Sequence, residues 1–157
     1  MKAFHLYIDM DGVLADFDRY VTEANGGAHP NDDGTSVWKH IHPGSFASFP
    51  VMEDAQELWD YVLPYKPTIL TATGHSVKTA EDEKKIWALM HFGHSETQTV
   101  MAGADKINMI NPDHYHKSIL VDDRPKAIDP WIKAGGIGIL HTSAEDSINQ
   151  LKIYLET

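Results

Sequence analysis

Short runs of apolar residues alternate with amphipathic stretches along most of the chain. The apolar runs lie at 3–8, 68–72, 97–102, 118–121 and 137–140. They are too short for stable helices and suit strands that are buried on both faces. The stretches between them suit helical connections, so the alternation predicts a parallel sheet with helical crossovers.

Helical spacing is clearest just before the second apolar run. Five apolar residues there repeat at i, i+3, i+4, i+7 and i+8, which predicts a helix ending at Pro64. They are Ala55, Leu58, Trp59, Val62 and Leu63. Further helices are expected at 76–92, 125–134 and 143–155, the first capped by Ser76 and stopped by Gly93. We therefore expect an α/β fold, a Rossmann-like parallel sheet in a three-layer arrangement.

A polar segment without clear periodicity follows the first apolar run. From residue 18 to about 49 it is rich in Gly, Asn, Asp, His and Pro, with scattered aromatic residues. This composition is typical of irregular structure, not of a second large domain. We expect residues 18–63 to form a small cap inserted after the first strand, and residues 1–17 and 64–157 to form the core.

Composition and charge limit the functions and binding partners that the chain can have. Over 157 residues, 42% hydrophobic content supports one compact domain with a small insert. The formal net charge of −10 disfavours a long nucleic acid as partner. The absence of cysteine excludes disulfides, thiolate zinc sites and a cysteine nucleophile. Since the chain has neither a signal-peptide pattern nor an apolar run of roughly 18–20 residues, we expect a cytoplasmic protein without a membrane partner.

Acidic and hydroxyl side chains follow three of the expected strands. Asp9 and Asp11 come after the first run, Thr71 lies near the end of the second, and Asp122 and Asp123 follow the fourth. Ligands of open parallel sheets bind beyond the carboxyl ends of the strands, so these side chains are expected in one crevice. An acidic turn would explain Asp-x-Asp-Gly alone. The second pair of acids favours an oxygen cage for Mg²⁺.

Four motifs resemble the signatures of the haloacid dehalogenase superfamily, in the same order. They are DMDGVLADF at 9–17, TILTAT with Thr71, AGADK with Lys106, and ILVDDRP with Asp122 and Asp123. The resemblance implies a haloacid dehalogenase-like core. It also implies that Asp9 attacks phosphorus and becomes an aspartyl-phosphate.

The same resemblance assigns roles to the remaining motif residues. Asp11 acts as general acid and then as general base, and its backbone carbonyl binds the metal. Thr71 donates a hydrogen bond to a transferring oxygen, and Lys106 neutralises charge on Asp9 and on the phosphoryl group. The implied ligands of Mg²⁺ are Asp9, Asp11, Asp122 and Asp123.

Within the superfamily, the chain most resembles the 5'(3')-deoxyribonucleotidases. DMDGVLADF, VDDRP and EKKIWALMHFG at 83–93 carry this likeness, whereas Ala72-Thr73-Gly74-His75 departs from the serine and proline expected after Thr71. The family closes aromatic cap residues over the base and sugar, and packing of the cap against the core is the alternative role for such residues. The expected substrate-binding residues are Gly12, Trp38, Phe46, Phe49, Ala72, Thr73 and His75.

We therefore expect a magnesium-dependent phosphomonoesterase that dephosphorylates nucleoside monophosphates, as a monomer or homodimer. A polynucleotide 3'-phosphate or a sugar phosphate is the alternative substrate, and a non-catalytic binding protein with this core is the alternative class. The order of the motifs excludes a receiver domain, in which the paired acids follow the first strand. We interpret residues 81–85 as a charged helix face.

Overall fold

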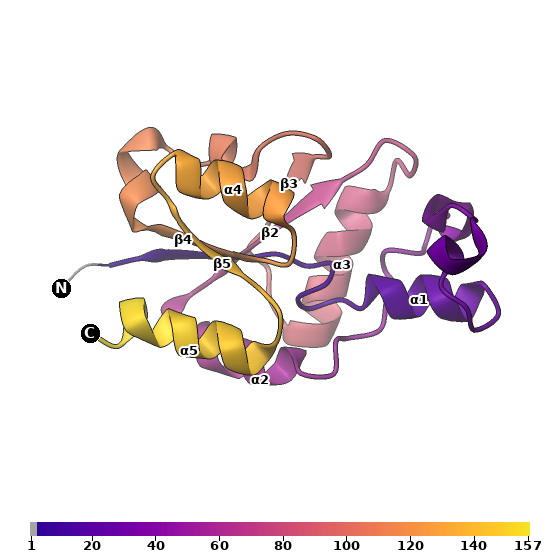
Figure 1. The fold of residues 1–157 in the computed structure, drawn as a ribbon, viewed down its shortest axis with the longest axis horizontal. Helices are drawn as coiled ribbons and strands as arrows, with labels where there is room; N and C mark the ends of the chain where they lie inside the picture. Colours follow the sequence, from indigo (N-terminus) through magenta and orange to yellow (C-terminus); the bar gives the residue numbers. More distant parts are fainter. Residues whose placement is uncertain (1–2) are drawn as a thin grey trace.

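A parallel sheet of five strands forms the centre of the molecule (Figure 1). The computed structural model describes residues 3–157, so the first two residues of the expected core segment 1–17 lie outside the described part. The strands are β1 His5–Ile8, β2 Thr68–Thr73, β3 Thr97–Met101, β4 Ser118–Asp122 and β5 Ile137–Leu140, in the order β3-β2-β1-β4-β5. This architecture confirms the predicted α/β fold.

The register of the central strands brings their carboxyl ends together. Ile8 at the end of β1 pairs with Ile69 of β2 on one side and with Val121 of β4 on the other. Because the strands are parallel, the residues that follow β1 and β4 leave the sheet at the same edge. This edge is where the sequence places its acidic pairs.

Helices cover both faces of the sheet, as the three-layer prediction requires. They are α2 Ala55–Val62, α3 Ala80–Phe92, α4 Pro125–Lys133 and α5 Ala144–Leu155. Figure 1 shows α4 above the strands and α2 and α5 below them. Neighbouring strand residues face opposite layers, since Ile119 joins the apolar cluster with α2 and α5 whereas Leu120 joins the cluster with Trp131 of α4.

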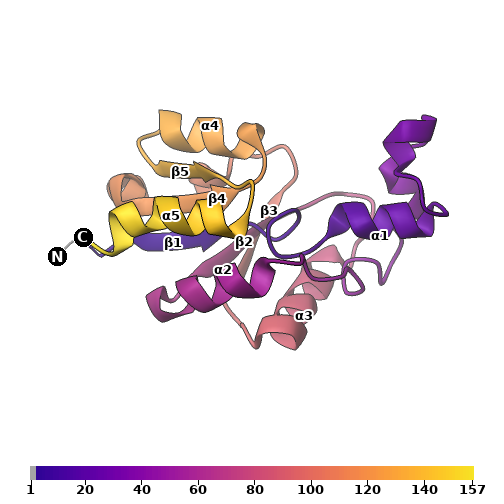
Figure 2. The same cartoon turned by 60° about the horizontal axis from the view of Figure 1, so that its bottom comes forward.

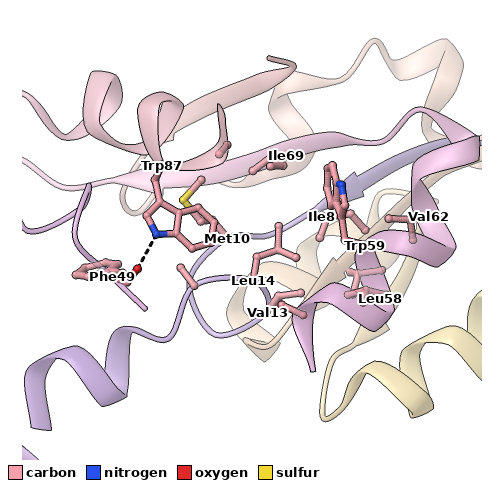
Figure 3. Close-up of a cluster of buried hydrophobic side chains, with 14 of the residues drawn as sticks. Ile8, Met10, Val13, Leu14, Phe49, Leu58, Trp59, Val62, Ile69 and Trp87 are labelled. Atoms are coloured by element: carbon pink, nitrogen blue, oxygen red, sulfur yellow. Dashed lines mark hydrogen bonds between the residues drawn. The ribbon is translucent and has the colours of Figure 1, made fainter. Parts of the chain in front are cut away.

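The loop after β1 is anchored in the larger apolar cluster (Figure 3). Met10, Val13 and Leu14 are fully buried, and burying such a side chain stabilises the fold by about 1.5–3 kcal/mol. The backbone N–H groups of Leu14 and Ala15 both donate to the Met10 carbonyl at 2.8 Å. These contacts fix the backbone on either side of Asp11.

The expected cap segment projects beyond the sheet edge. It contains α1 Phe17–Ala24 and two short 3₁₀ helices, Pro30–Asp33 and Val37–His40, and Figures 1 and 2 both show this part extending away from the strands. The base of the projecting part is closed, because Asp16 N–H donates to the Pro50 carbonyl at 2.7 Å and Met52 N–H to the Leu14 carbonyl at 2.8 Å. Helix α2, which follows, packs against α5.

One helix start differs from the sequence-based expectation. Helix α3 begins at Ala80 with Thr79 as its N-cap residue, so the prediction of Ser76 as the cap was wrong. Helix α2 ends at Val62 with Leu63 as its C-cap residue, directly before Pro64 as predicted, and Pro64 lies in a following 3₁₀ turn, Leu63–Tyr65. Gly93 ends α3 in the left-handed conformation, as predicted.

None of the helices within residues 3–157 combines the length and apolar character that crossing a membrane requires.

Candidate active site

A buried lysine joins two aspartates at the carboxyl edge of the sheet. Lys106, the first residue of a 3₁₀ helix after β3, donates from Nζ to Asp9 Oδ1 at 2.8 Å and to Asp122 Oδ2 at 2.7 Å. Its third hydrogen bond, at 2.8 Å, goes to the Leu70 carbonyl of β2. The ammonium group has three hydrogens, so its donors are fully used. The structure therefore brings together side chains that are separated by more than a hundred positions in the sequence.

The electrostatics around this lysine leave an excess of negative charge. Burial raises the pKa of Asp9, although Lys106 acts in the opposite direction. Burial and the neighbouring carboxylates of Asp9 and Asp122 raise the pKa of Asp123 to about 8. Burial lowers the pKa of Lys106, but Asp9 and Asp122 outweigh it and the net pKa is raised. One lysine thus balances only part of the charge that three ionised aspartates would carry.

The three aspartates fit a divalent cation. Asp9, Asp122 and Asp123 each offer a carboxylate oxygen, and these oxygens lie within 4.8 Å of one another. Asp123 Oδ1 is buried and has no hydrogen-bond partner within residues 3–157. Hard oxygen donors at this spacing suit Mg²⁺, whose charge would offset the mutual repulsion of the carboxylates. The Asp11 carboxylate is outside this group, and its backbone carbonyl is the atom that the family resemblance implies as a metal ligand.

Gly12 shapes the same site from the backbone. Its φ of 85° lies in the left-handed region, and a Cβ at this position would stand 2.1 Å from Asp123 Oδ2. Any larger residue would displace the Asp123 carboxylate. Gly12 therefore lies against a candidate metal ligand, outside the residues that line the cavity described below.

A second buried lysine, Lys84 of α3, holds the other two candidate catalytic side chains. With only 1% of its surface exposed, it donates from Nζ to Asp11 Oδ2 at 2.9 Å and to Thr71 Oγ1 at 2.8 Å. Its Nζ also lies 5.1 Å from the centre of the Phe46 ring. Neither of the two lysines carries its charge into solvent.

The interpretation of residues 81–85 as a charged helix face was therefore wrong for two of its members. Glu83 and Lys84 are buried, whereas Glu81 and Lys85 form an exposed ion pair at 3.0 Å. The helical period contained the signal, because position 84 lies four residues after buried Ala80 and three before buried Trp87. A lysine on the apolar side of a helix indicates a buried acidic or hydroxyl partner.

A cavity of about 660 Å³ opens above these groups. Its polar lining contains Asp9, Asp11, Thr71, Lys106 and Asp122. Its aromatic lining comes from the expected cap and its approach, namely Phe17, Trp38 and Phe46. The other charged residues of the lining are Arg124 and Lys126, at the start of α4, and the acidic residues Asp105 and Asp129.

The candidate substrate-binding residues divide into two groups. Trp38, which is 53% exposed, Phe46 and Ala72 line the cavity. Phe49 is buried outside the lining, where its ring contacts those of Phe17 and Phe46 at centroid distances of 5.5 and 5.3 Å.

The lining of the cavity differs from the predicted set of substrate-binding residues at further positions. Thr73 and His75 lie outside it, whereas Gly74 between them lines the cavity. Phe17 was missed as a lining residue, although it is the last residue of the first motif. Its position directly after the anchored β1 loop is the signal that could have identified it.

Comparisons with known proteins identify the fold. No protein-family model matches the sequence, and no curated protein does so. Similar solved structures include L-2-haloacid dehalogenase from Xanthobacter autotrophicus with chloropropionic acid covalently bound, at a TM-score of 0.58 and 10% identity over 99% of this chain and 85% of that one. D,D-heptose 1,7-bisphosphate phosphatase from Burkholderia thailandensis gives 0.52 and 9%, covering 94% and 97%. A hydrolase from Streptococcus pneumoniae TIGR4 gives 0.52 and 14%, covering 99% and 100%. The chain has the haloacid dehalogenase-like hydrolase fold.

Proposed function

We propose that this protein is a magnesium-dependent phosphomonoesterase that forms an aspartyl-phosphate on Asp9 and acts on nucleoside monophosphates. The observation that carries the proposal is the meeting of Asp9, Asp122 and Asp123 beside Lys106 at the carboxyl edge of the sheet, where Asp9, Asp122 and Lys106 line the cavity. Catalytic groups at the carboxyl edge of a parallel sheet are placed for a ligand in this position.

Asp9 is the proposed nucleophile because of its position and surroundings. It lines the cavity, and Lys106 fixes one of its oxygens. Bound Mg²⁺ would screen the charges of Asp9 and of the phosphate so that the two anions can approach. Lys106 then remains beside the phosphoryl group and stabilises the charge that develops during the transfer.

Asp11 and Thr71 are proposed to serve the departing group and the transferred group. Asp11 would give its proton to the alcohol oxygen as the ester bond breaks, and would later remove a proton from the water that hydrolyses the aspartyl-phosphate. The Thr71 hydroxyl would donate to a phosphoryl oxygen. Both side chains line the same cavity as Asp9.

The aromatic lining favours a nucleotide as substrate. The volume of about 660 Å³ lies within the roughly 300–1,000 Å³ of small-molecule sites. Phe17 and Trp38 contact each other with ring centroids 6.1 Å apart, and the exposed face of Trp38 is available to a base. Stacking of one base on an aromatic side chain contributes about 1–3 kcal/mol.

A panel of phosphomonoesters tests the proposal most directly. With Mg²⁺ present, phosphate release should be faster from deoxynucleoside 5'- and 3'-monophosphates than from sugar phosphates. Asp9→Asn should abolish release on every substrate while its thermal unfolding stays cooperative, because the amide is no nucleophile. Equal rates on nucleotides and sugar phosphates would remove the nucleotide assignment, and full activity of Asp9→Asn would remove the assignment of the nucleophile.

A further inference from the structure

Lys84 reaches the active site from outside the four motifs. Its ammonium group lies between the loop after β1 and the end of β2, and it hydrogen-bonds one side chain from each. The two partners are Asp11 and Thr71, which belong to the proposed proton transfer and phosphoryl binding. Lys106 contacts neither of them, since its three bonds go to Asp9, Asp122 and Leu70.

The bond from Lys84 determines how the Thr71 hydroxyl points. An ammonium group can only donate, so Thr71 Oγ1 must be the acceptor in this 2.8 Å bond. The hydroxyl has one hydrogen, and that hydrogen must then point away from Lys84. It is left for another acceptor, and a phosphoryl oxygen in the cavity that Thr71 lines is such a group.

The second bond distinguishes the two oxygens of Asp11. Oδ2 accepts from Lys84 at 2.9 Å, whereas Oδ1 is buried and has no hydrogen-bond partner in the described chain, residues 3–157. A buried carboxylate oxygen without a partner costs free energy unless a ligand, a proton or water satisfies it. Oδ1 is therefore the oxygen that remains for exchange of a proton with the substrate.

The position of Lys84 is itself fixed by its neighbours. Glu83, the preceding residue of α3, accepts from Phe46 N–H at 3.1 Å through Oε1 and from the Thr79 hydroxyl through Oε2. The Phe46 ring lies against Lys84 Nζ, so the aromatic lining and the lysine are held by the same turn of α3. A lysine enclosed in this way has little rotational freedom left to lose when substrate binds.

We propose that Lys84 is a positioning residue that orients Asp11 for proton donation to the leaving group and turns the Thr71 hydroxyl toward the phosphoryl group. The proposal rests on the phosphomonoesterase function proposed above. Lys84 acts through these two side chains and does not itself touch the reacting atoms.

The test compares kcat/KM of Lys84→Met on two kinds of ester, since methionine has a similar length without the ammonium donors. An alkyl phosphate needs a proton on its departing oxygen, whereas p-nitrophenyl phosphate releases a stable phenolate and needs little. We expect kcat/KM to fall on the order of 100-fold for the alkyl ester and less than about tenfold for the aryl ester. Lys85→Met, which removes an exposed ion pair on the same helix, is the matched control and should retain both rates.

A loss of the same factor on both esters, or no loss on either, would overturn the positioning role. Lys84→Arg keeps the charge and provides the second variant if Lys84→Met does not fold. It should recover part of the alkyl-ester rate, and an arginine variant with both rates lowered equally would also overturn the proposal.

An ammonium ¹H–¹⁵N spectrum of the intact protein tests the geometry without turnover. A slowly exchanging Lys84 signal that shifts in Asp11→Asn supports the contact, and a Lys84 signal unaffected by Asp11→Asn contradicts it. If the wild-type protein shows the contact but hydrolyses neither ester, the phosphomonoesterase proposal fails and the catalytic meaning of Lys84 fails with it. If the wild-type protein is active but Lys84→Met lowers kcat/KM equally on both esters, only the role of Lys84 is contradicted.

Discussion

Two buried lysines divide the polar groups at the sheet edge between them. Lys106 is bound to Asp9 and Asp122, and Lys84 is bound to Asp11 and Thr71. Removing one partner of a buried ion pair leaves a charge without compensation, which typically costs 3–5 kcal/mol. The side chains that we assign to catalysis are therefore also positioned by contacts on which local stability depends.

Gly12→Ala should lower both the stability and the metal affinity of the protein. The substitution places a methyl group against the Asp123 carboxylate and strains a backbone with a φ of 85°. The left-handed backbone alone costs about 1–2 kcal/mol for a residue with a Cβ. Denaturant unfolding and calorimetric titration with Mg²⁺ would measure the two effects.

Gly26→Ala is the matched control for this substitution. Gly26 has a similar φ of 78°, but nothing lies within 4 Å of the Cβ that would be added. It should show the backbone cost without a change in Mg²⁺ affinity. If the two variants bound Mg²⁺ equally well, Gly12 would have no role in placing Asp123.

At the level of elements, the cap and its approach supply the aromatic side of the cavity. Trp38 lies on the 3₁₀ helix Val37–His40, and its ring contacts that of Phe17 at the start of α1. Phe46 is held differently, because its backbone N–H is bound to Glu83 of α3. Trp38 is thus the exposed aromatic residue of the lining, and Phe46 is the fixed one.

Trp38→Ala should weaken nucleotide binding without changing the chemical step. The loss of one stacking contact, about 1–3 kcal/mol, corresponds to a rise in KM of roughly 5- to 150-fold with a similar kcat. KM for a sugar phosphate should change little, because no base is present to stack. Steady-state kinetics on both substrates would decide, and equal effects on the two would argue against stacking.

The strands could be predicted because their signal is local and strong. Runs that are apolar on both faces and too short for helices, such as 118–121, have few alternatives in a chain of this size. The meeting of Asp9 with Asp122 follows from parallel strands, whose carboxyl ends share one edge. Helix ends were less accurate. Helix α3 begins after Thr79, whose hydroxyl makes no cap hydrogen bond and donates to Glu83 instead, so no local capping pattern marks this end.

Buried charge was the feature that the sequence reading missed. Lysines are rarely buried without a partner, so Lys84 was assigned to the surface from its residue type. Its pairing with Asp11 depends on the approach of α3 to a loop 73 positions away. Phe49 was predicted to bind substrate because it is an aromatic residue in a polar segment. Its burial against the rings of Phe17 and Phe46 becomes visible only in the folded chain.

On the scale of the whole molecule, the acidic balance makes a cation central to the proposed chemistry. The chain carries a net charge of −10, and three of its aspartates meet at the carboxyl edge of the sheet. Metal binding there would join β1 to β4 through their carboxyl ends. The same ion would therefore stabilise the sheet and admit an anionic substrate.

The affinity for Mg²⁺ should rise with pH up to about 8. Burial and the carboxylates of Asp9 and Asp122 raise the pKa of Asp123 to about 8, so at lower pH this side chain carries a proton that a metal must displace. One displaced proton corresponds to at most about a tenfold change in affinity for each pH unit below that value. Calorimetric titrations at several pH values should show proton release, and Asp123→Asn should remove the part of the pH dependence that Asp123 contributes.

The stability of the metal-free protein should change in the opposite direction. Because the folded pKa of Asp123 lies above its unfolded value of 3.8, the folded state binds more protons between these values and loses stability as pH rises toward 8. Adding Mg²⁺ should then raise Tm more at pH 8 than at pH 6. Thermal melts in EDTA and in Mg²⁺ measure the difference, and an equal gain at both pH values would contradict it.

The closed base of the projecting part separates the geometry of the cap from the geometry of the sheet edge. The chain departs at Asp16 and returns at Pro50, and backbone hydrogen bonds join these two points directly below the projecting part. The distance between departure and return is therefore independent of what lies between them. We expect a change in length or sequence of the intervening residues to alter the aromatic lining that Trp38 and Phe46 provide, and to leave the spacing of the carboxylates at the sheet edge unchanged.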